Sequence, residues 1–305
     1  MRVRILGSAA GGGFPQWNCG CDNCRSARNG NLRSSARTQS SIAVSADGAR
    51  WCLVNASPDL RAQVLSFAAL VPRSGRGTAI DAILLTDAEI DHVGGLLSLR
   101  ETQALRLYCS AAVFTWVFEA NPMFAALLQP GKLVWSPVTD RATHPIRTAD
   151  ERDTGLSFQA FFVRGKVPTY VRSAPAAGDG ATLAYRIADD RSGSSILYVP
   201  AIREIDDDFL AALPAAACLL FDGSFWSDRE LEASGVGTRT ATSMGHLPIG
   251  GAEGSLERLR DLGRMRRIYT HVNNTNPILD QRSPQYAALV EAGWEVAEDG
   301  MDLDV

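Results

Sequence analysis

The chain has 305 residues, of which 46% are hydrophobic, and its 30 basic and 34 acidic side chains leave a formal net charge of −4. This composition allows one large α/β domain or two smaller ones, and the absence of a basic excess argues against a general nucleic-acid-binding protein. No apolar run reaches the roughly 20 residues of a membrane span. The apolar start at 3–6 runs directly into glycines, so we expect a cytoplasmic protein without a signal peptide or membrane segment.

Short apolar runs separated by Gly, Ser and Asp predict two groups of strands along the chain. The first group comprises 3–6, 41–44, 51–54 and 80–85, and the second comprises 156–163, 183–187, 195–199, 217–221 and 267–270. Helices are predicted at 60–65, 93–101, 112–128, 256–262 and 286–292. The stretch 174–181 is a candidate mobile loop. Two strand-rich halves that each carry helices fit a single domain over 1–305, a four-layer αβ/βα sandwich with two mixed sheets face to face.

The segment after the strand at 80–85 resembles the metal-binding loop of metallo-β-lactamases, whose common form is His-x-His-x-Asp-His. In that form the first two histidines bind one metal and the Asp-His pair binds a second. Asp87 and Glu89 stand in place of the two histidines here, and carboxylates are poor replacements for imidazoles that hold a hydrolytic zinc. Asp91 and His92 remain as half of a single-metal site. We therefore expect one active-site metal, whose chemistry need not be hydrolysis.

A third metal ligand is expected at the end of another strand, where α/β proteins usually carry their chemistry. Among four histidines, His271 directly follows the strand at 267–270 and best completes Asp91 and His92. His246 lies in a tight loop and is a candidate proton-transfer group, whereas His144 has no motif around it. One aspartate and two histidines form the facial triad of non-haem iron(II) proteins that activate oxygen. Zinc with a bound water, as in a hydrolase, fits the same ligands.

A cysteine cluster near the N-terminus predicts a second metal site. Cys19, Cys21 and Cys24 fall within six residues of a glycine-containing polar loop, a spacing that favours tetrahedral zinc with a fourth ligand from elsewhere. A disulfide with one spare thiol is the alternative. The isolated cysteines lie in apolar stretches and are predicted to be core residues: Cys52, Cys109 and Cys218.

Several long motifs make the chain resemble the PqqB family of coenzyme PQQ (pyrroloquinoline quinone) biosynthesis proteins over essentially its whole length. They are GSAAGGGFPQWNC at 7–19, RTQSS at 37–41, NASPD at 55–59, FDGSFW at 221–226, MGHLPI at 244–249 and THVNNTNP at 270–277. The resemblance implies a metallo-β-lactamase-like fold and a step in PQQ assembly. The implied substrate is a cross-linked glutamate–tyrosine diamino acid derived from a precursor peptide. The implied reaction is hydroxylation of its tyrosine ring with Fe(II) and dioxygen, and other enzymes of the pathway are possible partners.

Comparison with hydrolytic relatives, such as transfer-RNA 3′-processing nucleases, implies further residue roles. Gly165 falls near their loop histidine and Ala201 near their metal-bridging aspartate, so both ligands of a first metal are missing. Asp222 and His246 correspond to an acidic residue and a histidine that form a relay in those hydrolases. The resemblance thus implies that Asp222 orients His246 to take a phenolic proton, although Asp222 as a simple loop cap before Ser224 is the alternative.

Three predicted roles remain for residues near the two metal sites. Asp87 and Glu89 are expected to recruit substrate ammonium groups or to bind metal-bound water, and metal binding by Glu89 is a further alternative. Related phosphodiesterases take a fourth zinc ligand three residues after their last active-site histidine, a position that is Asn274 here. Asn274 is therefore the candidate fourth ligand of the cysteine site.

Three functions stay open from the sequence. The favoured one is an oxygen-dependent hydroxylase, because the dinuclear hydrolytic ligand set is lost in three places. A metal-dependent hydrolase is the second. A non-catalytic PQQ carrier is the third, and it gives no reason for keeping a metal triad.

Overall fold

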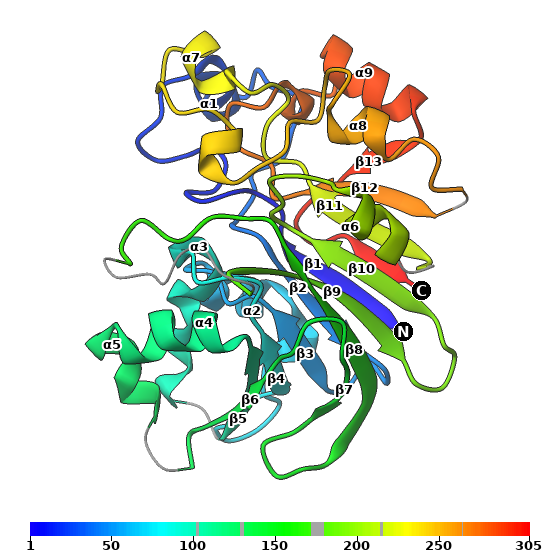
Figure 1. The fold of residues 1–305 in the computed structure, drawn as a ribbon. Helices are drawn as coiled ribbons and strands as arrows, with labels where there is room; N and C mark the ends of the chain where they lie inside the picture. The colour runs from blue at the N-terminus through cyan, green and yellow to red at the C-terminus, as the bar shows by residue number, and fades with distance from the viewer. Residues whose placement is uncertain (102–103, 129–130, 172–179, 214–215, 264) are drawn as a thin grey trace.

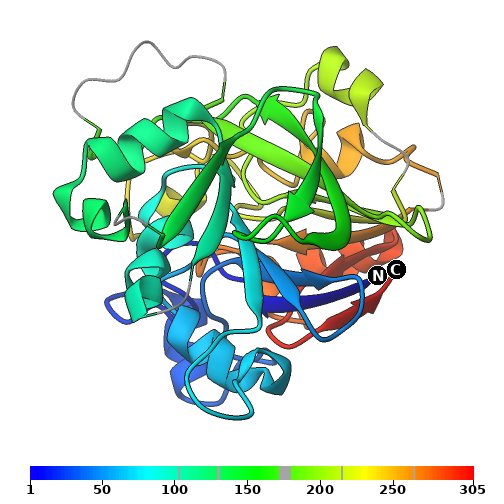
Figure 2. The same ribbon diagram turned by 90° about the horizontal axis from the view of Figure 1, so that it is seen from below.

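The computed structural model describes the whole chain except residues 102–103, 129–130, 172–179, 214–215 and 264. Most of the loop predicted over 174–181 lies outside the described residues. The described chain forms two seven-stranded sheets that face each other, with helices on the outside (Figures 1 and 2). This arrangement confirms the predicted αβ/βα sandwich.

The first sheet has the order β14-β1-β2-β3-β4-β5-β6. Strands β3 to β6 run parallel, and β14, β1 and β2 join them through antiparallel pairs. All five residues of β4 are buried, as expected for a parallel strand that is covered on both faces. The strands are β1 (Arg2–Gly7), β2 (Ser41–Ser45), β3 (Trp51–Val54), β4 (Ile80–Leu84), β5 (Leu105–Cys109), β6 (Leu133–Pro137) and β14 (Asp302–Asp304).

The second sheet has the order β13-β12-β11-β10-β9-β8-β7. Strands β10 to β13 are parallel, and β7 to β10 are antiparallel. The parallel register sets Asp222 at the end of β11 opposite Thr270 at the end of β12, so residues that follow these strands meet at one edge. The strands are β7 (Thr143–Arg147), β8 (Asp153–Val163), β9 (Thr182–Asp189), β10 (Ser195–Val199), β11 (Cys218–Asp222), β12 (Arg266–Thr270) and β13 (Trp294–Val296).

The helices are short and lie at the periphery of the molecule (Figure 1). In chain order they are α1 (Asp22–Arg28), α2 (Leu60–Ser66), α3 (Ile90–Val93), α4 (Ala111–Phe114), α5 (Pro122–Ala125), α6 (Asp207–Ala212), α7 (Glu230–Ala233), α8 (Ser255–Arg258) and α9 (Pro284–Glu291). No single helix in the described ranges is long and apolar enough to cross a membrane; one bent pair, Ala111–Glu119 with Pro122–Leu128, meets the length and composition criteria together.

Three helix predictions were wrong in their extent, and one of them, over 256–262, is the four-residue α8, Ser255–Arg258. The helix predicted over 93–101 is a 3₁₀ segment, Gly94–Glu101, that follows the single turn of α3. Gly95 packs directly on the backbone of the segment before α2, because a Cβ there would lie 2.0 Å from the Ser57 carbonyl oxygen. The helix predicted over 112–128 breaks at Asn121, whose extended backbone precedes Pro122, a position where proline disfavours helix.

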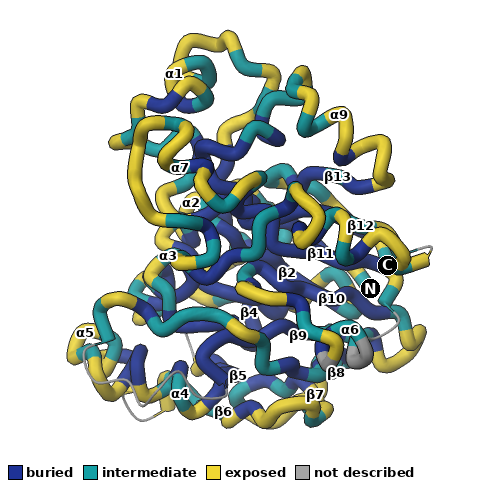
Figure 3. The backbone as a smooth tube through the Cα atoms, turned by 45° about the horizontal axis from the view of Figure 1, so that its top comes forward, coloured by how far each residue is buried: buried dark blue, intermediate teal, exposed yellow. Residues whose placement is uncertain are grey.

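The core fills the space between and around the sheets, as the buried strands at the centre of Figure 3 show. Cys52, Cys109 and Cys218 are buried in β3, β5 and β11, which confirms the prediction that they are core residues. Exposed residues are concentrated in the outer helices and loops (Figure 3). The edge where β4, β11 and β12 end is therefore a rigid place to mount polar side chains.

Candidate metal centre

The structure brings together the three side chains predicted to hold the active-site metal. Asp91 and His92 lie in α3, just after β4, and His271 directly follows β12. Asp91 Oδ2 lies 3.3 Å from His271 Nε2 and 4.0 Å from His92 Nε2. One ligand atom from each residue lies within 4.8 Å of the other two. A single cation can therefore contact all three side chains.

Two features of the histidines fit a cation at this point. His92 Nε2 is buried and has no hydrogen-bond partner within the described residues, a condition that is rare in folded proteins unless an ion or water completes it. His271 has a φ of +56°, in the left-handed region that residues other than glycine seldom occupy. Such strained positions are common at functional sites, where the surrounding structure holds them.

Asp87 is the hydrogen-bond partner of His92. Its Oδ2 lies 2.7 Å from His92 Nδ1, and its Oδ1 accepts a 2.8 Å hydrogen bond from the Glu89 backbone N–H. Burial alone would lower the pKa of His92, but the carboxylates of Asp87 and Asp91 raise it to about 9. A carboxylate behind a ligating histidine fixes the ring so that its other nitrogen faces the metal. Asp87 thus stands at a histidine position of the common loop and supports the ligand that remains.

Ser224 joins His271 to the pair of Asp222 and His246, a role that the sequence analysis missed. Asp222 Oδ2 lies 2.8 Å from His246 Nδ1, so the structure brings the two predicted relay residues together. The Ser224 hydroxyl donates to Asp222 Oδ1 at 2.6 Å and lies 2.8 Å from His271 Nδ1. Because its proton is directed at Asp222, Ser224 accepts from His271 Nδ1–H. His271 Nε2 then keeps its lone pair for a cation.

Glu89 lines a cavity beside the triad, and its carboxylate contacts Lys166. The Lys166 ammonium group lies 3.1 Å from Glu89 Oε1. Burial raises the pKa of Glu89, and Lys166 partly opposes this shift. The sequence analysis did not predict a role for Lys166, because no motif surrounds it between Gly165 and Val167.

An open cavity lies beside the triad, and Asp91, His92 and His271 all line it. Gly165 and Ala201 both contribute to its wall. A Cβ on Gly165 would lie 1.9 Å from Thr182 Oγ1, so a histidine does not fit there without movement of β9. A side chain larger than that of glycine is therefore disfavoured at position 165 of this chain.

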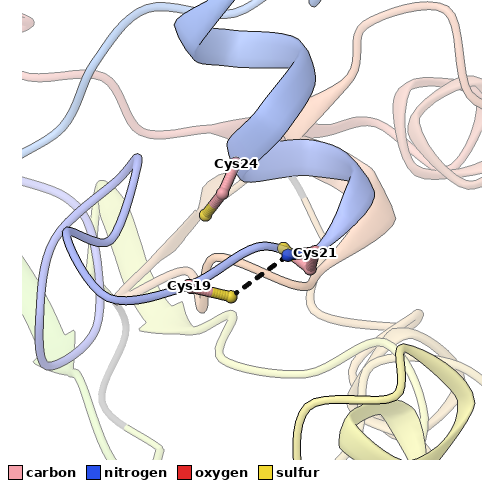
Figure 4. A group of neighbouring side chains, drawn as sticks. All are labelled: Cys19, Cys21 and Cys24. Atoms are coloured by element: carbon pink, nitrogen blue, oxygen red, sulfur yellow. Dashed lines mark hydrogen bonds between the residues drawn. The ribbon is translucent and has the colours of Figure 1, made fainter.

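The cysteine cluster forms a second candidate metal site, at the start of α1 (Figure 4). The Sγ atoms of Cys19, Cys21 and Cys24 lie within 4.8 Å of one another, and all three are free thiols. The side-chain amide of Asn274 lies over them, with Nδ2 at 3.1, 3.5 and 3.4 Å from the three sulfurs. Rotation of that amide presents its oxygen instead, so Asn274 is placed to serve as a fourth ligand. His144 lies elsewhere, stacked on Phe158.

The two layered sheets and the metal-ligand cluster at their edge define a metallo-β-lactamase-fold protein, and the β-lactamase superfamily domain model matches residues 50–272. The chain is 47% identical to coenzyme PQQ synthesis protein B of Pseudomonas entomophila, over 99% of both chains. The Zn²⁺-bound PqqB structure from Methylobacterium extorquens superposes with a TM-score of 0.92 at 39% identity, covering 100% of both chains. The chain therefore belongs to the coenzyme PQQ synthesis protein B family.

A more distant structure, a diphosphatase from the PhnP family, shares the fold with a TM-score of 0.68 at 18% identity and covers 100% of this chain and 97% of its own. Proteins of the metallo-β-lactamase fold are usually metal-dependent enzymes. The family match confirms the resemblance stated from the motifs, and it agrees with the site geometry described above.

Proposed function

We propose that the protein acts in PQQ biosynthesis as an iron(II)- and oxygen-dependent hydroxylase of the tyrosine ring in the cross-linked glutamate–tyrosine diamino acid. The observation that carries the proposal is the set of Asp91, His92 and His271 around one point of an open cavity. The positions of a second metal's ligands hold Gly165 and Ala201 instead. A lone facial triad suits oxygen activation better than two-metal hydrolysis.

Asp91, His92 and His271 would hold the iron, which supplies the activation of dioxygen that ring hydroxylation requires. Asp87 and Ser224 keep the two imidazoles in the tautomer whose Nε2 faces the ion. The cysteines and Asn274 would hold a structural zinc, apart from the chemistry.

His246 is the residue placed to move a substrate proton. Its Nδ1–H donates to Asp222 Oδ2, which leaves Nε2 as the basic atom at the cavity wall. Its ring stacks on His271 with a centroid separation of 5.2 Å, so a phenol bound beside the triad lies within its reach. His246 would take the phenolic proton, and buried Asp222 would stabilise the imidazolium that forms.

The proposal is tested with protein that is prepared without oxygen, loaded with Fe(II) and supplied with the diamino acid, isotopically labelled dioxygen and a two-electron reductant such as ascorbate, which provides the electrons that reduce the second oxygen atom to water. We expect a hydroxylated product whose new oxygen comes from dioxygen, and loss of turnover in His271→Ala. His144→Ala is the matched control, since His144 lies outside the cavity, and it should keep turnover. Product formed without dioxygen, or with oxygen from water, would refute the hydroxylase and favour a zinc-type hydrolase. Tight PQQ binding without turnover would instead indicate a carrier.

A further inference from the structure

The cavity wall carries one charge pair that the proposed metal chemistry does not use. Lys166 and Glu89 form an ion pair in which each side chain is 26% exposed, and both line the cavity of the triad. The other two carboxylates of this wall are engaged by histidines, Asp87 by His92 and Asp91 by His271. Among the described residues of the wall, Lys166 is the only lysine or arginine.

The segment that carries Lys166 is fixed against the rest of the site. The Tyr170 hydroxyl donates to the Ala88 carbonyl oxygen, which ties this segment to the loop that carries Glu89. The Lys166 stem passes so close to Gly245 that a Cβ there would lie 3.0 Å from Lys166 Cγ. The ammonium group is therefore held at the cavity.

The choice of lysine is unusual for this chain. Of its 30 basic residues, only those at positions 132 and 166 are lysines. A lysine ammonium is a compact charge on a flexible stem that can change partners, whereas an arginine favours a fixed planar pairing. A compact cation at the cavity suits a ligand that binds reversibly.

We propose that Lys166 and Glu89 form a subsite for the α-amino-acid part of a zwitterionic substrate, with Lys166 binding the carboxylate and Glu89 the ammonium group. This inference rests on the proposed function, in which the substrate is an amino acid derivative with a phenol ring. A ligand with a single charge would leave one member of the pair without a partner. A zwitterion satisfies both members, and opening a partly exposed ion pair costs little. The contacts that replace it are charge-assisted hydrogen bonds in a half-enclosed cavity.

Three small probes with the same phenol ring test the subsite: L-tyrosine, tyramine, which lacks the carboxylate, and hydroxyphenylpropionate, which lacks the ammonium group. Their binding to the zinc-loaded protein is measured by isothermal titration calorimetry. We expect L-tyrosine to bind about tenfold more tightly than either truncated probe, as the loss of one charged hydrogen bond implies. Lys166→Met should abolish the advantage over tyramine, and Glu89→Gln the advantage over hydroxyphenylpropionate. Lys132→Met, the matched control, should retain both advantages.

A second measurement uses the unmodified protein and the scarcity of lysine. L-tyrosine should slow acetylation of Lys166 relative to Lys132 in the same sample, as mass spectrometry would report. Equal affinity for the three probes, equal weakening of all three by Lys166→Met, or no binding of L-tyrosine would each overturn the subsite. Zinc-loaded protein needs no oxygen chemistry, so these results are independent of the isotope experiment. Failure of the hydroxylase proposal alone would leave the tyrosine preference intact.

Discussion

Replacing Asp87 by asparagine should weaken the active-site metal while leaving the fold intact. In the native chain Asp87 Oδ2 accepts hydrogen bonds from His92 Nδ1–H and from the Thr86 hydroxyl, and Oδ1 accepts one from the Glu89 backbone N–H. Asparagine keeps one acceptor and turns the other oxygen into a donor. If the new NH₂ faces His92, it demands the opposite imidazole tautomer, whose Nε2 then carries a proton and cannot bind a cation. If it faces the Glu89 N–H, two donors oppose each other in a buried site.

Either orientation of the asparagine amide weakens metal binding, and one of them also destabilises the folded protein. Loss of a carboxylate behind a metal-bound histidine typically weakens metal binding by about 10- to 100-fold, or about 1.4 to 2.7 kcal/mol. We expect this loss for Fe(II) and for Zn²⁺ in competition with a coloured chelator, using metal-free protein at neutral pH. The opposed-donor orientation would also lower the free energy of unfolding by about 1–3 kcal/mol, which denaturant titration measures.

Asp81→Asn is the matched control for this experiment. Asp81 is another buried aspartate, but it lies within β4 and pairs with Arg50, away from the triad. The control should lose stability without losing metal affinity. If Asp87→Asn binds metal as tightly as the native chain, the argument that Asp87 orients His92 is wrong.

Four further outcomes follow from the same structure. Metal affinity should rise with pH up to about 9, by at most about tenfold per pH unit, because the metal-free protein holds a proton on His92 that metal binding must release. Measurement of the affinity at pH 7 and at pH 9 checks this, and equal affinities would contradict it. Ser224→Ala should weaken metal binding by about tenfold, because His271 loses the acceptor that sets its tautomer, and it should also lower the melting temperature, because the buried His271 Nδ1–H is left without a partner; metal competition and thermal melts check the two effects. Burial raises the pKa of Glu230 to about 7, so the folded chain holds a proton there that the unfolded chain has lost above pH 4.5. Stability should then fall by up to about 3 kcal/mol as pH rises to 7, and Glu230→Gln should remove that fall in denaturant titrations. Cys19→Ser should remove one equivalent of zinc in elemental analysis and lower the melting temperature, whereas unchanged zinc content would argue against the cysteine site.

Nine of the fourteen strands in the described chain were predictable because they are apolar runs bounded by glycine and polar residues, whereas β5, β6, β7, β13 and β14 were not predicted. β4 at Ile80–Leu84 is a continuous buried run, and the polar loop after it stands out against that background. The grouping of the triad was predictable for two reasons: the loop with Asp91 and His92 resembles the metallo-β-lactamase metal loop, and His271 directly follows β12. Local pattern and strand-end position carried this part of the prediction.

Ser224 and Lys166 were not predictable in the same way, because their roles depend on pairings between distant segments. Ser224 reaches His271 only because β11 and β12 pair in parallel, with Asp222 opposite Thr270. Lys166 meets Glu89 only because the loop after β8 folds over the loop after β4. Ser224 lies within the FDGSFW motif at 221–226, but the motif does not show which group its hydroxyl contacts, and Lys166 lies in no motif.

One short segment, which begins at His271, contacts both the cysteine cluster and the triad. Asn274 lies three residues further on and covers the cysteine sulfurs. The Asn23 side chain, from α1, donates to the carbonyl oxygens of Asn274 and Asn276 at 3.1 and 3.0 Å. Asn276 in turn donates to the carbonyl oxygens of Gly223 and Ser224, the residues that position the triad histidine. The segment that follows His271 therefore contacts both candidate metal sites, and its hydrogen bonds join the cysteine loop to the residues beside the triad.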